Sequence, residues 1–168
     1  MGSELAAEIG RLTEDLGAMC AIAADILRWA TVGLVRSDVE APTRIGPALA
    51  EADELHTSIG ERAFAILSGD KPAAPELRAA LSAFPISAAA HRMGGLAANV
   101  DRRRQDGVQV PDEALDVFDG MGRHAVALAE RVRAALLSND ADEARRIETD
   151  DQVTNDLHRA LFAMVHDD

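Results

Sequence analysis

The stretch that decides the fold runs from Ile9 to Ala30 and reads IGRLTEDLGAMCAIAADILRWA. Its apolar side chains recur at alternating steps of three and four residues, which places them in one narrow stripe along an α-helix. The stripe consists of Ile9, Leu12, Leu16, Met19, Ala23, Ile26 and Ala30. Because this spacing is typical of long helices that pack side by side, it predicts a helical bundle.

The same apolar pattern returns 102 positions later in the chain. The matched pairs are Leu16 and Phe118, Met19 and Met121, Ile26 and Leu128, Ala30 and Val132, and Leu34 and Leu136. The match continues without an insertion to the dipeptides Leu55-His56 and Leu157-His158. Such a period indicates a duplicated unit. We therefore expect a three-helix repeat over residues 1–105 and the first two helices of a second repeat over residues 106–168.

Prolines and turn residues divide the chain into five expected helices, and no segment keeps the alternation of a β-strand. The expected helices cover about 3–36, 42–67, 75–104, 111–137 and 141–166. Ser3 is a plausible N-cap, and Pro42 and Pro47 open the second helix. Pro85 should kink or split the third helix, because proline removes a backbone hydrogen bond and clashes with the preceding turn. The predicted fold class is all-α, with tandem three-helix-bundle repeats of which the second lacks its last helix.

The fourth and fifth expected helices carry apolar stripes that need a third neighbour. Burial of a Leu or Phe side chain is worth about 1.5–3 kcal/mol, and two helices alone would leave much of this stripe exposed. We therefore expect a homo-oligomer, in its simplest form a homodimer, that associates through these two helices, with exchange of a helix between subunits as one route.

The composition excludes several function classes. The 168 residues are 48% hydrophobic, which is enough for a core, and 17 basic against 29 acidic side chains give a net charge of -12. This surface repels phosphate backbones, so no nucleic-acid partner is expected. Charges and glycines interrupt every apolar stretch before about 20 residues, and no signal peptide begins the chain, so we expect a cytoplasmic protein without direct membrane insertion. The single cysteine, Cys20, is interpreted as a packing residue.

Several residue types invite a more specific function, and each has a structural alternative. The histidines are the candidates for a phosphotransfer bundle, at His56, His91, His124, His158 and His166. His56 and His158 hold equivalent positions in the two repeats, which favours a structural role. No Glu-x-x-His pair of a di-iron bundle occurs, and no local motif supports catalysis by Ser, His and Asp or by paired carboxylates.

Two further motifs lie in or after the third expected helix. Met93-Gly94-Gly95 falls within the helix, so these glycines are expected to allow close helix approach and not to hold a phosphate. The basic run Arg102-Arg103-Arg104 either favours the C-terminus of its helix or docks to an acidic patch on a partner.

The segment His91–Val100 resembles a motif of the PhoU family of phosphate uptake regulators. In that family the third helix of each repeat carries a pattern close to Glu-Arg-Ile-Gly-Asp-x-Ala-x-Asn-Ile, and this sequence matches it at Arg92, Gly94, Ala97 and Asn99. Pro72 with Glu76-Leu77-Arg78 resembles the entry to the same helix, and Asp151 with 157–162 resembles the family's second repeat. The resemblance covers the whole chain.

The resemblance implies a non-enzymatic cytoplasmic adaptor. Such a protein relays the state of a phosphate import transporter, through contact with its ATPase, to a sensor histidine kinase and so represses phosphate-starvation genes. The alternatives are a helical protein-interaction module without a phosphate role and a His-phosphotransfer-like bundle.

Some PhoU-like proteins bind iron or zinc through acidic pairs spaced four residues apart, a spacing that places both carboxylates on one helix face. This sequence departs from that pattern. The equivalent positions hold His91 and Gly95 in the third helix, and Asp151 and Asn155 in the fifth. Each lost carboxylate removes a ligand and a charge, so no cofactor is expected, and iron or zinc only as a minor alternative.

Overall fold

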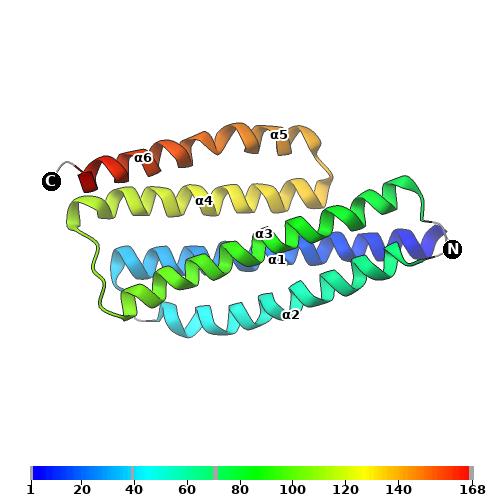
Figure 1. Ribbon diagram of the computed structural model, residues 1–168, viewed down its shortest axis with the longest axis horizontal. Coiled ribbons are helices and arrows are strands. Elements are labelled where there is room, and N and C mark those ends of the chain that lie inside the picture. Colours follow the sequence, from blue (N-terminus) through cyan, green and yellow to red (C-terminus); the bar gives the residue numbers. More distant parts are fainter. Residues whose placement is uncertain (1, 39, 70–71, 167–168) are drawn as a thin grey trace.

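The computed structural model describes residues 2–38, 40–69 and 72–166, with side chains left undescribed at 2–3 and 164–166. Within these ranges the chain forms helices joined by turns and contains no β-strand. The helices are α1 (Gly2–Arg36), α2 (Ala41–Leu67), α3 (Ala74–Gln105), α4 (Asp112–Ser138), α5 (Ala141–Asp150) and α6 (Gln152–His166), as labelled in Figure 1. The all-α prediction is therefore confirmed.

Prolines mark three helix starts as the sequence predicts. Pro42 and Pro75 lie in the first turns of α2 and α3, and Pro111 precedes α4 as its N-cap. In these positions a missing N–H costs nothing, because the first N–H groups of a helix have no intrahelical acceptor. Pro47, expected to open α2, instead lies inside it. The predicted N-cap side chain, Ser3, lies outside the described side chains.

Two boundary predictions are wrong. The third helix does not split at Pro85: α3 runs without interruption and buries Ala83 and Ser87 on either side of the exposed proline, while the kink stays a prediction. Packing of this helix face against the bundle opposes the break that an interior proline favours. The expected helix over 141–166 does divide, into α5 and α6 at Asp151. α5 has no buried residue, so little tertiary packing holds the two segments in one continuous helix.

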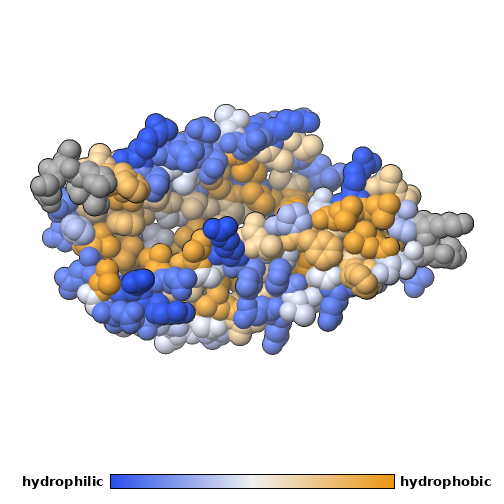
Figure 2. All heavy atoms as spheres, in the orientation of Figure 1, coloured by the Kyte–Doolittle hydropathy of each residue, from blue (hydrophilic) through white to orange (hydrophobic). Residues whose placement is uncertain are grey.

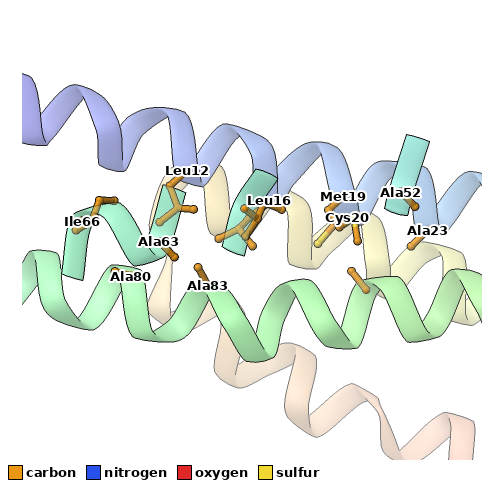
Figure 3. Packing of buried hydrophobic residues seen from close by; sticks show 12 residues of the cluster. Leu12, Leu16, Met19, Cys20, Ala23, Ala52, Ala63, Ile66, Ala80 and Ala83 are labelled. Carbon is orange, nitrogen blue, oxygen red and sulfur yellow. The ribbon is translucent and has the colours of Figure 1, made fainter. Parts of the chain in front are cut away.

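Helices α1, α2 and α3 contact one another and enclose the main core. The predicted stripe of α1 lies at its centre, with Leu12, Met19 and Ile26 at most 1% exposed. Alanines and isoleucines of α2 and α3 face this stripe, as Figure 3 shows for Ala63, Ile66, Ala80 and Ala83. Small side chains let the three helices approach closely around the larger residues of α1.

Helix α4 packs against the other side of α1, and α5 and α6 contact α4 and each other but no other described helix. Figure 1 shows that α4 runs antiparallel to α1 and that the α5–α6 segment lies along its outer side. Two charge contacts tie this segment down. Arg131 Nε donates to Glu143 at 2.6 Å and Arg131 Nη1 donates to Asp150 at 2.6 Å. The hydrogen bond that Arg131 donates to Glu143, with a further one from Arg146, lowers the pKa of Glu143.

The apolar stripe of α4 is less covered than the matching stripe of α1. Leu16, Met19 and Ile26 are buried, whereas their partners at a distance of 102 positions, Phe118, Met121 and Leu128, are only half-buried. The physical reason is the missing neighbour: α1 contacts three other helices, whereas α4 contacts α1 on one side and α5–α6 on the other. One apolar face of α4 therefore lacks a helix equivalent to α3.

Several features of α1 and α4 agree with the expected repeat, which stays a prediction. α1 ends at Arg36 and α4 at Ser138, again 102 positions apart. The following residues, Ser37 and Asn139, are the non-glycine residues with positive φ in the described chain, each at 54°. An identical left-handed conformation after both helices is what a duplicated helix–turn unit would produce.

One helix among the described residues is long and apolar enough to cross a membrane, which corrects the expectation that none is. It covers Glu4–Arg36, and its most apolar stretch has a mean hydropathy of 1.6. In this structure 44% of that stretch is buried within the bundle. The central helix of a bundle meets the same criteria of length and composition, because it must be apolar toward several neighbours.

Gly122 sets the distance between α4 and α1, which yields a testable prediction. A Cβ at this position would lie 2.2 Å from Thr31 Oγ1, 2.3 Å from Cγ2 and 2.8 Å from Cβ. We expect Gly122→Ala to lower the free energy of unfolding by about 1–3 kcal/mol, because the stiff Thr31 side chain cannot clear the new methyl group. Urea denaturation followed by circular dichroism measures this change.

Gly120 provides the matched control in the same helix. A Cβ there meets no atom within 4 Å, so Gly120→Ala should leave stability unchanged or raise it by about 0.5–1 kcal/mol. Equal effects of the two substitutions would show that α1 and α4 are not in close contact at Gly122.

Candidate functional site

Four polar side chains meet on the seam between α2 and α3. Asp53 and His56 come from α2, and Ser87 and His91 come from α3. The two helices form an antiparallel pair, so residues at equal distances from the connection between Leu67 and Ala74 lie opposite each other (Figure 1). This geometry brings together groups that lie more than 30 positions apart in the chain.

Hydrogen bonds and ring stacking connect the four groups. His56 Nδ1 and Ser87 Oγ share a hydrogen bond of 2.6 Å, and His91 Nε2 donates to Asp53 Oδ1 at 2.6 Å. The two imidazole rings stack with their centroids 4.9 Å apart and their planes at 18°. One nitrogen of each ring is thus occupied by a bond within the cluster.

Burial changes steeply across the cluster. Ser87 is 1% exposed, whereas the side chains of His91 and Asp53 are 39% and 68% exposed. The hydrogen bond to His56 satisfies the buried Ser87 hydroxyl, which would otherwise be costly to bury. Asp53 accepts a hydrogen bond from His91 and not from His56, which bonds to Ser87. The two imidazole rings contact each other by stacking, with no hydrogen bond between them given by the structure. The arrangement therefore differs from a Ser-His-Asp relay, in which one histidine bonds both other groups.

The structure does not bring the four family-equivalent metal positions together. His91 lies in the cluster described above, and Gly95 is half-buried four residues further along α3. Asp151 and Asn155 are exposed at the junction of α5 and α6 and in α6, on helices that contact α4 but neither α2 nor α3. Among the described residues no group of three or more His, Cys, Asp or Glu side chains is arranged to hold a metal ion.

The residues of the family motif on α3 have unlike surroundings. Gly94 is buried, and a Cβ there would lie 3.3 Å from Ile26 Cδ1, so the expected close helix approach occurs at this glycine. At Gly95 a Cβ meets no atom within 4 Å, so that expectation is wrong for the second glycine. Ala97 is buried against α1 and α2, whereas Arg92 and Asn99 are exposed.

The basic run at the end of α3 divides into two kinds of residue. Arg104 Nε and Nη2 donate to Asp101 Oδ1 at 3.2 and 3.1 Å, and Gln105 donates to the other carboxylate oxygen at 2.6 Å. These bonds satisfy Asp101, which is only 2% exposed. Arg102 and Arg103 are exposed in the last turn, where a cation is favourable at the negative end of the helix dipole.

The remaining histidines and the cysteine lie apart from this cluster. His124 is half-buried, and its Nε2 has no hydrogen-bond partner in the described structure. His158, the repeat partner of His56, is exposed and packs edge-on against Phe162 with centroids 4.9 Å apart. The side chain of His166 lies outside the described residues. Cys20 is buried, which raises the pKa of its thiol and agrees with its interpretation as a packing residue.

Sequence reasoning missed the pairing of His56 with Ser87 and of Asp53 with His91. The signal available in the sequence was their placement at matching distances on either side of the connection between the second and third helices. Without knowledge of how the two helices rotate against each other, that placement could not identify which side chains share the seam.

Comparison with known proteins gives a consistent set of relatives from mycobacteria. The "Phosphate-specific transport system accessory protein PhoU homolog 2" of Mycobacterium tuberculosis is 34% identical over 163 residues, which cover 95% of this chain and 76% of the relative. Homolog 1 of the same species is 33% identical, with 94% and 74% covered. Homolog 1 of Mycobacterium leprae is 32% identical, with 95% and 73% covered.

No protein-family model and no solved structure matches the chain significantly. The assignment rests on the relatives, whose similarity extends along nearly the whole chain and so includes the α1–α3 bundle, α4 and the α5–α6 segment. At this identity and coverage, and with a helical bundle as its fold, the chain belongs to the PhoU family.

Proposed function

We propose that this protein is a non-enzymatic accessory protein of a phosphate transport system, acting in the cytoplasm. It contacts the ATPase of a phosphate ABC transporter, relays the state of that transporter to a sensor histidine kinase, and so represses phosphate-responsive genes. The observation that carries the proposal is the similarity, over about 95% of the chain, to proteins named as phosphate-specific transport system accessory proteins.

The shape and charge of the molecule suit a binding role. Helices α1, α2 and α3 pack around a core that their own side chains fill. The net charge of -12 keeps such a surface soluble and selects partners with basic contact regions. Several large apolar side chains remain exposed on different helices, among them Phe64, Leu81 and Val153.

The rival proposals make different demands on the structure. A His-phosphotransfer bundle needs an exposed histidine with a free ring nitrogen, for which His158 is the best placed. His56 and His91 each have one nitrogen engaged in the seam cluster. A helical interaction module without a phosphate role would use the same fold with an unrelated partner, and only a physiological assay separates it from the first proposal.

The half-buried stripe of α4 supports self-association. Phe118, Met121 and Leu128 lie on a helix that lacks the neighbour α3 provides for α1. We propose that a second copy covers this face, which gives a homodimer with α4 and the α5–α6 segment at its interface. Covering this face removes the remaining exposed surface of several large apolar side chains from water, and each contributes only part of the roughly 1.5–3 kcal/mol for full burial because it is already half-buried.

For cofactors, we propose that the protein acts without a bound metal or other group. At the positions where the family places paired carboxylates, His91 bonds to Asp53 and Gly95 offers no side chain. Asp151 and Asn155 lie in the α5–α6 segment, which contacts α4 but not α3. A single exposed carboxylate holds a hard cation weakly.

Deletion of the gene tests the regulatory proposal. We expect the deletion strain to show constitutive phosphatase expression and phosphate uptake in phosphate-rich medium, because the repressing signal from the transporter is lost. A plasmid copy of the wild-type gene should restore repression. A deletion strain with normal phosphate regulation would favour the interaction module without a phosphate role.

The oligomeric proposal is tested by light scattering coupled to size-exclusion chromatography at micromolar concentration. We expect a dimer for the wild type and a shift to monomer for Phe118→Ser with Leu128→Ser, since the interface loses two apolar side chains. Leu96→Ser, an exposed residue of α3, is the control and should stay dimeric. A wild-type monomer that binds no hydrophobic dye would contradict the proposal.

Metal analysis tests the proposed absence of a cofactor. Protein purified without chelator or affinity tag should contain far less than one equivalent of iron or zinc. His91→Glu with Gly95→Asp restores an acidic pair on one face of α3 and should raise metal uptake from added iron or zinc. Stoichiometric metal in the wild-type protein would refute the proposal.

A further inference from the structure

An apolar patch lies on the outer face of the α2–α3 hairpin. Phe64, Leu81 and Phe84 are 66%, 57% and 40% exposed, and they come from two helices that pack against each other. We call these three residues the α2–α3 patch. Figure 2 shows apolar surface over the N-terminal half of α3, at the right of the molecule. Grouped exposed residues of this size mark interaction sites more often than scattered ones do.

The patch is not needed to hold α2 and α3 together. Ala63 and Ile66 of α2 and Ala80 and Ala83 of α3, each at most 3% exposed, already fill the core between these helices and α1 (Figure 3). Phe64 directly follows Ala63, and Phe84 directly follows Ala83, and one helical step turns a side chain by about 100°, so both aromatic rings point out of the core beside these alanines. Their exposure therefore calls for a role outside the core.

A hollow of about 310 Å³ opens beside the patch. Buried Ile59 and Ser87 line it, and Phe84, His56 and Glu61 border it. Gly60 also lines the hollow, and a Cβ there would meet no atom within 4 Å. The glycine thus leaves open a space at the lower end of the size range of binding pockets, large enough for one bulky apolar side chain.

The exposed charged residues that flank the hollow on its α2 side are acidic. Asp53, Glu54 and Glu61 are exposed along α2, whereas on α3 the exposed neighbours of Phe84, from Leu81 to Ala88, carry no charge. An occupant with an apolar side chain in the hollow would meet carboxylates on one flank and apolar surface on the other. Lysine or arginine on the first flank complements this arrangement.

We propose that the α2–α3 patch and the hollow beside Gly60 dock a cationic amphipathic helix of a partner protein. One apolar side chain of that helix enters the hollow, its neighbours cover Phe64 and Leu81, and its basic residues face Glu54 and Glu61. This is the helix-in-groove mode of recognition. The identity of the partner as the ATPase of the phosphate transporter rests on the function proposed above.

The decisive variant fills the hollow without touching the core. In Gly60→Leu the new side chain occupies the space of the partner's apolar anchor, and a helix tolerates leucine better than glycine. Gly95→Leu is the matched control, because Gly95 of α3 is half-buried like Gly60, has no atom within 4 Å of a Cβ and is not followed by a proline. Glu61→Lys tests the charge, with the exposed Glu14→Lys on α1 as its control.

Binding of the purified full-length protein to the purified transporter ATPase is measured by calorimetry. We expect Gly60→Leu to weaken binding by about tenfold or more, as loss of a central anchor does, and Gly95→Leu to leave it unchanged. Glu61→Lys should weaken binding and reduce its salt dependence, whereas Glu14→Lys should change neither. Circular dichroism melting curves establish that each variant is folded.

A second arm separates failure of this inference from failure of the proposed function. A fluorescein-labelled 14-residue amphipathic helix of leucine and lysine serves as the probe. If the wild type binds the ATPase and Gly60→Leu binds equally well, the docking surface is wrong and the proposed function stands. If the wild type does not bind the ATPase, the transporter partnership is wrong. The peptide then decides the docking surface: weaker binding to Gly60→Leu than to Gly95→Leu supports it, and equal or absent binding overturns it.

Discussion

The burial of one apolar stripe on α1 is the constraint on which the rest of the structure depends. Leu12, Met19 and Ile26 are almost completely removed from water, and α2, α3 and α4 each contact α1 to achieve this. With about 1.5–3 kcal/mol for each large side chain, this stripe provides the driving force that fixes the positions of the three neighbouring helices. α5 and α6, which do not contact α1, have no fully buried residue among those described.

Close packing around α1 leaves two kinds of surface for binding. Along α2 and α3 the core is filled with alanine and isoleucine, so the larger Phe64, Leu81 and Phe84 lie outside it. Along α4 the apolar stripe itself is half-buried, because no helix covers the place that α3 takes on α1. The first surface has carboxylates on one flank and suits a basic partner, whereas the second is apolar and suits a copy of the same chain. Because the two surfaces lie on different helices, the proposed partner and the proposed second copy would not compete for the same residues.

The cluster of Asp53, His56, Ser87 and His91 on the α2–α3 seam shows how this chain departs from the family pattern at His91, where the resemblance implies a metal ligand. A histidine stands where an acid is expected, and it bonds to Asp53 of the neighbouring helix instead of leaving an open ligand position. Stacking against His56, which in turn bonds the buried Ser87, ties the surface of the hairpin to its interior. The hydrogen bonds and ring contact of these residues join α2 to α3, and the adjacent hollow beside Gly60 is the place where we propose that a side chain of the partner docks.

The sequence alone determined the helical class, the central stripe from Leu12 to Ala30 and most helix ends, because helix periodicity and proline positions act locally. It also carried the motif around Gly94 that resembles the PhoU family. Only the tertiary structure decided that α3 continues through Pro85, that the last helix divides at Asp151, and that His56 meets Ser87 while Asp53 meets His91. These outcomes depend on which helix faces are buried against which neighbours, and pairwise packing between distant segments leaves no local pattern in the chain.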